Sequence, residues 1–129
     1  CSFGRWKPVN LGYSGFISFN DYNFINKNIF QNLKFDEKYH PLLLEKLINL
    51  KKRYTFYGDI NKKIKLELKQ FNILHRDKKG INVIVKFNNA EEKNKITDYC
   101  EKHKYEFVEC PKMIRVSTDA ISIEVKRLE

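Results

Sequence analysis

The chain has 129 residues, of which 42 % are hydrophobic and 14 % aromatic, so we expect it to build a modest core and not to be a disordered tail. Its 25 lysines and arginines outnumber its 16 acidic residues, and the net charge of +9 favours a polyanionic partner, nucleic acid first and an anionic membrane surface second. No run of about 18 apolar residues is present, which argues against membrane insertion.

Residues 1–15 contain three of the five glycines and the single tryptophan, a composition that predicts an irregular N-terminal arm. We expect residues 16–129 to form one domain. In the arm, Arg5, Trp6 and Lys7 place an aromatic face beside two cations, a combination that can stack on unpaired bases and neutralise phosphate. The alternative, that Trp6 packs onto its own domain, stays open at this point.

Residues 16–19 have the composition of a short strand, and Asn20 or Asp21 could cap a helix that runs through Ile29. A second helix is predicted to begin at His40-Pro41, since proline suits the first helical turn. Its apolar residues recur on one face, and its last turn is predicted to carry three cations, Lys51, Lys52 and Arg53, at the negative end of the helix dipole.

The next stretch is predicted to be extended. Residues 54–57 are aromatic or β-branched, and Gly58-Asp59 is a turn signal. Residues 63–69 then alternate strictly between charged and apolar residues, which is typical of a half-buried strand. Lys63, Lys65 and Lys69 would share the charged face of that strand.

A ββαβ unit follows. Residues 71–74 and 81–87 read as strands on either side of a basic turn at residues 75–80. Asn89 offers an N-cap with Glu92 three residues later, which predicts a helix to His103, and residues 105–109 read as a third strand.

Beyond Pro111, residues 113–117 and 121–125 read as a C-terminal β-hairpin with a turn at Thr118-Asp119. The predicted fold class is therefore α/β, of the α+β type, in a compact single domain.

No sequence motif for a nucleotide, a catalytic serine or a metal is present, and we expect no catalytic residue, no metal and no cofactor. The best catalytic alternative is a small RNA-processing enzyme that uses Cys100 with His103, or Cys110 with His75 or His103. Helical spacing alone supplies neither a base nor an orienting group, so a buried Cys100 is favoured.

The positive charge is segregated along the chain. Residues 1–50 carry a net +2, residues 51–86 carry +8 and residues 87–129 carry −1. A solvated lysine-rich face would explain the lysines but not their segregation. A nucleic-acid-binding adaptor, or an adaptor for other proteins whose lysine-rich surface is incidental, stays open as an alternative. RNA binding is the leading hypothesis, through Arg5, Trp6, Lys7, Lys51, Lys52, Arg53, Lys62, Lys63, Lys65, Lys69, Arg76, Lys78 and Lys79.

The order of these motifs resembles the C-terminal portion of the universal large-subunit ribosomal protein fifteen family, especially its mitochondrial members. Four stretches carry the resemblance, namely Phe3-Gly4-Arg5 with Lys7-Pro8, residues 16–25, residues 41–48, and the strands and helix of residues 73–109.

This resemblance implies a non-catalytic structural component of the large ribosomal subunit that binds ribosomal RNA and neighbouring ribosomal proteins, with no small-molecule substrate. The predicted hairpin beyond Cys110 would extend past the usual bacterial end, which favours a mitochondrial ribosome, with a bacterial or plastid ribosome as alternatives.

Overall fold

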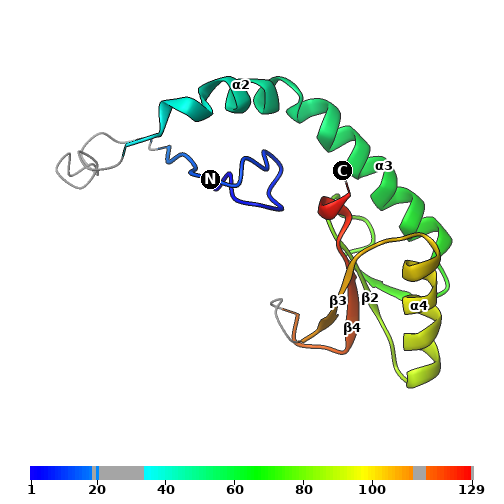
Figure 1. Ribbon diagram of the computed structural model, residues 1–129. Helices are drawn as coiled ribbons and strands as arrows, with labels where there is room; N and C mark the ends of the chain where they lie inside the picture. Colours follow the sequence, from blue (N-terminus) through cyan, green and yellow to red (C-terminus); the bar gives the residue numbers. More distant parts are fainter. Residues whose placement is uncertain (19, 21–33, 112–115, 129) are drawn as a thin grey trace. The chain divides into compact units, whose positions relative to one another are not determined.

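A computed structural model describes residues 1–18, 20, 34–111 and 116–128. The described chain forms two compact units, Cys1–Lys52 and Arg53–Glu129. Figure 1 shows the elements of both units, and each unit is described by itself below. The predicted division into an arm of residues 1–15 and a domain of residues 16–129 stays a prediction.

The first unit begins with a closed loop. The Phe3 N–H donates to the Ser14 carbonyl at 3.0 Å, and the Leu11 N–H donates back to the Phe3 carbonyl at 2.9 Å. Phe3, Val9 and Leu11 form a small buried cluster. Phe16, Ile17 and Ser18 form no strand, and the rest of the predicted strand and the helix to Ile29 lie outside the described residues, apart from Asn20.

Among its described residues, this unit also holds the 3₁₀ helix η2 (Glu37–Tyr39) and the helix α2 (His40–Ile48). Pro41 lies in the first turn of α2, as predicted. The predicted apolar face is mostly unburied, since Leu44 and Ile48 are 61 % and 72 % exposed. The helix ends at Ile48 and not at Arg53.

The helix α3 (Leu50–Glu67) replaces the two strands and the turn that we predicted for residues 54–69. Its buried residues Tyr57, Asn61 and Ile64, with Leu68 just beyond it, recur at helical spacing. Leu66, which a strand would bury beside Ile64 and Leu68, is 69 % exposed. The prediction of extended structure was therefore wrong, because Ile64 and Leu68, two of the three apolar residues of the alternation, also fit a helical stripe.

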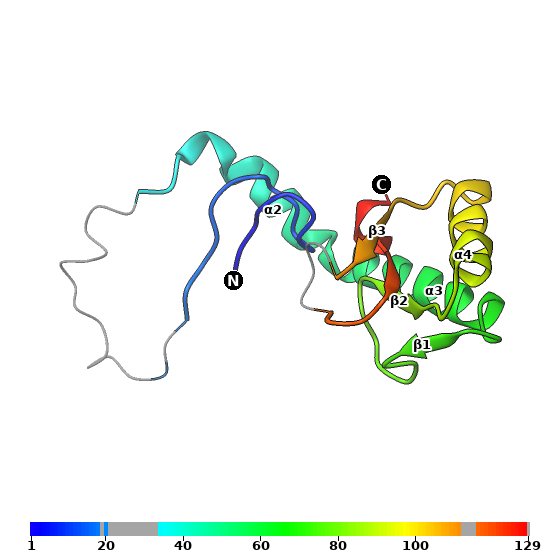
Figure 2. The same cartoon turned by 90° about the horizontal axis from the view of Figure 1, so that it is seen from below.

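The second unit holds a four-stranded antiparallel sheet with the strand order β1-β2-β4-β3. The ββαβ prediction is confirmed by β1 (Asn72–Leu74), β2 (Val83–Lys86), α4 (Ala90–Lys102) and β3 (Phe107–Cys110). Figure 2 shows β1 beside β2. The unit is thus a small α+β domain.

The helix α4 begins where the capping signal predicted. The Glu92 N–H donates to Asn89 Oδ1 at 2.9 Å. The Glu92 carboxylate accepts the Asn88 N–H at 2.8 Å, so the reciprocal bond of the capping box reaches one residue before the cap.

The strand β4 (Ala120–Ile123) lies in the middle of the sheet. It pairs with β2 on one side and with β3 on the other, and a short 3₁₀ helix, η3 (Val125–Arg127), follows it. The predicted hairpin with residues 113–117 is wrong over the described residues, because both edges of β4 are occupied. Residues 112–115 lie outside the described residues.

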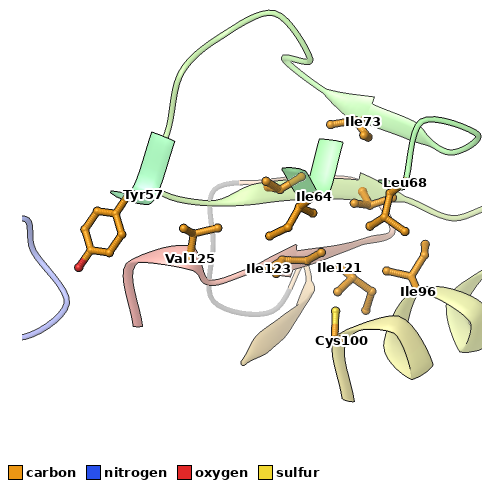
Figure 3. Packing of buried hydrophobic residues seen from close by; sticks show 11 residues of the cluster. Tyr57, Ile64, Leu68, Ile73, Ile96, Cys100, Ile121, Ile123 and Val125 are labelled. Atoms are coloured by element: carbon orange, nitrogen blue, oxygen red, sulfur yellow. The ribbon is translucent and has the colours of Figure 1, made fainter. Parts of the chain in front are cut away.

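One face of the sheet packs against the helices α3 and α4. Val83 and Val85 of β2 pair in register with Ile123 and Ile121 of β4, so their side chains share this face. Figure 3 shows Ile64 and Leu68 from the α3 side, and Ile96 and Cys100 from α4, gathered around Ile121 and Ile123. All of these side chains are at most 2 % exposed. This core fixes the C-terminal end of α3 against the sheet.

Candidate nucleic-acid interface

The end of α3 and the loop between β1 and β2 bring six cations together. Lys62 and Lys65 are three residues apart on one side of α3, and Lys69 follows four residues later in the turn after the helix. The loop of residues 75–82 lies against the same part of α3 through the hydrogen bonds described next. We call the following six residues the basic cluster: Lys62, Lys65, Lys69, Arg76, Lys78 and Lys79.

Two members of the basic cluster are engaged within the protein. The Lys65 ammonium group donates to the Lys78 carbonyl at 2.5 Å and, more weakly, to the His75 carbonyl at 3.5 Å. Partial burial lowers the pKa of Lys65, and the charge of Asp77 opposes that effect. The Arg76 guanidinium group donates to the carbonyls of Lys69 and Phe71 at 2.9 and 2.7 Å.

The other four members present their charge to solvent. Lys62, Lys69, Lys78 and Lys79 are exposed, and none of their side chains has a hydrogen-bond or ion-pair partner within the described ranges. Asp77 is the one acidic residue of the loop. Long side chains of this kind can reach phosphates without burying their charge.

The remaining cations predicted on this stretch lie elsewhere. Lys63 points to Glu67, with 4.0 Å between the ammonium nitrogen and the carboxylate oxygen, and Glu67 also accepts the Tyr99 hydroxyl. Arg53 lies over the ring of the buried Tyr57, 5.3 Å from its centroid, and donates to its hydroxyl. These two residues contribute to contacts of α3 more than to an exposed cluster.

Lys51 and Lys52 lie in the first turn of α3 and belong to the first unit. The prediction that they end the preceding helix was wrong, because α2 and α3 are separated at Asn49. Both side chains are exposed, but they stand at the positive end of the α3 dipole.

In the N-terminal loop, the Arg5 guanidinium carbon lies 4.6 Å from the centroid of the Trp6 ring. This contact is a cation–π pair. Trp6 is half-buried and is not a member of the buried cluster of Phe3, Val9 and Leu11, while Arg5 and Lys7 are exposed. The structure thus places the three predicted residues in one loop of the first unit.

A buried polar network escaped the sequence analysis. The Glu124 carboxylate, 3 % exposed, accepts from Asn82 Nδ2 and from the Ser122 hydroxyl, both at 2.8 Å, and pairs with Lys126 at 2.7 Å. Its one signal in the sequence is the pair of polar residues within the apolar run of residues 121–125. The network ties the chain after β4 to the beginning of β2.

Asn61 is a second buried polar residue that the sequence analysis missed. Its side-chain amide donates to the carbonyls of Gly80 and Asn82 at 3.1 and 3.0 Å. Its signal would have been a helical reading of residues 57–68, in which Asn61 falls on the buried side.

The cysteine alternative finds little support in the geometry. Cys100 is fully buried, and burial raises the pKa of its thiol to about 12, while burial also raises the pKa of Cys110. Neither thiol is hydrogen-bonded to a histidine in the described part of the chain. A catalytic thiol needs the opposite shift of the pKa and a nearby base.

Within the described ranges there is no group of three or more His, Cys, Asp and Glu side chains placed to hold a metal ion. Among the helices that the structure describes, none has the length and apolar character needed to cross a membrane.

The comparisons with known proteins give one match. The family model described as the MJ1341 family C-terminal domain matches residues 51–129, which is more than half of the chain. No curated protein and no solved structure matches the chain.

The resemblance to large-subunit ribosomal protein fifteen is therefore wrong, since the matching family is a different one. We had expected a ribosomal protein, neighbouring ribosomal proteins and a mitochondrial ribosome because of this resemblance. The family match gives these expectations no support. The chain belongs to the MJ1341 family, whose C-terminal domain spans residues 51–129.

Proposed function

We propose that this chain binds RNA through the basic cluster and performs no chemistry on it. The observation that carries the proposal is that cations from two separate segments, the end of α3 and the loop of residues 75–82, meet at one place. Affinity for nucleic acids rests largely on such phosphate contacts.

RNA is favoured over duplex DNA by the residue types on the helices. Reading the major groove requires a helix with exposed Arg, Asn or Gln side chains in a row. The Asn61 side chain of α3 is buried, and Arg53 packs on Tyr57. Cations at a loop tip suit the backbone of a single-stranded or irregular RNA better.

The non-catalytic part of the proposal is supported by the state of the thiols. Both Cys100 and Cys110 are buried with raised pKa values, so neither is poised as a nucleophile at neutral pH.

The test is the affinity for a single-stranded RNA, measured by fluorescence anisotropy over a range of salt concentrations. We expect the logarithm of the affinity to fall linearly with the logarithm of the salt concentration. The double variant Lys78→Met/Lys79→Met should lose a slope of about 0.7 for each phosphate contact removed.

The matched control is Lys93→Met/Lys95→Met. It makes the same change in net charge, but each of these lysines is ion-paired with a glutamate, Glu109 or Glu91, at 2.7 Å. We expect this control to leave the slope nearly unchanged. A flat salt dependence of the wild type, as an adaptor for other proteins would give, contradicts the proposal, and so does an equal loss in the control.

A further inference from the structure

Lys65 lies within the basic cluster but points its charge at the protein. Its ammonium group donates to the Lys78 carbonyl at 2.5 Å and reaches the His75 carbonyl at 3.5 Å. The Lys78 N–H in turn donates to the His75 carbonyl at 2.9 Å, which closes a turn over residues 75–78. One ammonium group thus holds both ends of the turn that carries Lys78.

Asn61 holds the same loop further along. Its buried amide, one helical turn before Lys65, donates to the carbonyls of Gly80 and Asn82. The helix therefore engages four loop carbonyls with two side chains, those of Asn61 and Lys65.

Arg76 makes the reverse connection, from the loop to the end of the helix. Its guanidinium group donates to the carbonyls of Lys69 and Phe71, just past the last residue of α3. Both carbonyls lie in the turn between α3 and β1, so Arg76 ties that turn to the loop that carries Lys78 and Lys79. His75, whose carbonyl accepts from Lys65 and which precedes Arg76 in the chain, has a φ of 53°. Non-glycine residues adopt this left-handed conformation only when their surroundings enforce it.

We propose that Lys65 is a positioning residue, whose ammonium group fixes the loop so that Lys78 and Lys79 face the RNA, and that it does not itself contact the RNA. This inference rests on the function proposed above and divides the basic cluster by role. Lys62, Lys69, Lys78 and Lys79 contact phosphates, whereas Lys65 and Arg76 hold the surface that presents them.

The experiment is a double-mutant cycle on RNA affinity. Lys65→Met removes the donor with little loss of side-chain length, and it is measured in the wild type and in the Lys78→Met/Lys79→Met background. We expect Lys65→Met to weaken binding about fivefold in the wild type and by less than about twofold in that background, since its effect passes through the two lysines.

The matched control is Lys62→Met, an exposed lysine of the same helix side that makes no bond to the loop. It should weaken binding by the same factor in both backgrounds.

Amide hydrogen exchange of Lys78, measured without RNA, reports on the turn itself. Lys65→Met should speed the exchange of this amide, while Lys62→Met should not, and Lys65→Arg, which keeps the donor, should restore slow exchange. If Lys65→Met melts the domain, Lys65→Gln, which is also uncharged and is shorter than lysine, takes its place. The Lys78 amide should then exchange faster than in the wild type, and an unchanged rate contradicts the contact.

Three outcomes overturn the inference. An equal loss in both backgrounds makes Lys65 a direct RNA contact. An unchanged exchange rate at Lys78 shows that Lys65 does not hold the turn. Wild-type affinity in Lys65→Met shows that holding the turn does not matter for binding. A wild type with no salt-dependent RNA binding is recognised beforehand in the salt titration and overturns the proposed function itself.

Discussion

At the scale of single residues, the three cysteines have different environments. Cys1 is exposed, whereas Cys100 and Cys110 are buried. Burial in an apolar core disfavours the thiolate of Cys100, and the negative charge of Glu101 adds to this effect. Cys100 contributes to the packing of α4 against the sheet.

We expect Cys100 to make stability fall at alkaline pH. Its pKa is raised from 9.0 in the unfolded chain to about 12 in the folded protein, so its contribution is full below about pH 9 and is lost as the pH rises toward 12. Urea unfolding at about pH 7.5 and about pH 10.5 should show a smaller loss for Cys100→Ala than for the wild type. Equal losses would contradict the raised pKa.

Single residues also show how much of the candidate site the sequence could predict. The excess of cations in residues 51–86, and the turn that carries Lys78 and Lys79, were both visible as patterns of residue type. The inward direction of Lys65 was not, because it depends on a carbonyl 13 positions away in the chain. Charge can be counted along a sequence, but the direction of a side chain is set by the fold.

At the scale of elements, the sequence predicted strands where the structure has the helix α3. Residues 63–69 fit a period of two as well as a helix, because a short apolar run does not distinguish the two periods. The neighbouring Tyr57 and Asn61 extend the helical stripe, but a tyrosine and an asparagine are weak markers of a buried face. By contrast, α4 was predictable because its capping signal is local.

The two leucines at the end of α3 provide a direct check of this correction. Leu68 is 2 % exposed and Leu66 is 69 % exposed, although a strand would bury both. We expect Leu68→Ala to lower the free energy of unfolding by about 2–5 kcal/mol and Leu66→Ala to change it by about 0.5 kcal/mol or less. Urea unfolding of the two variants measures this difference. Similar losses for both would favour the strand.

At the scale of the whole molecule, the family match and the second compact unit have nearly the same boundary, residue 51 against residue 53. The buried cluster of this unit draws all its members from residues 57–125. The resemblance to the ribosomal protein family rests instead on the order of short apolar motifs, many of them in residues 1–50. Such motifs are common to many small domains, so their order was not specific.

We expect a fragment of residues 51–129 to fold by itself, because its core is complete within it. Circular dichroism should show a cooperative thermal transition for this fragment. A fragment of residues 51–118, which lacks β4, is the control and should show none, since β2 and β3 then lose their shared partner. A non-cooperative melt of residues 51–129 would contradict the prediction.

The central place of β4 also bears on biosynthesis. During synthesis, β1 and β2 are made close together in the chain and can pair, but β3 has no partner strand until β4 has been made. Until β4 joins the sheet, one edge of β2 and the whole of β3 lack their native partner, and unpaired edges are open to wrong pairing. The native sheet is therefore closed only by one of the last segments of this chain to be made.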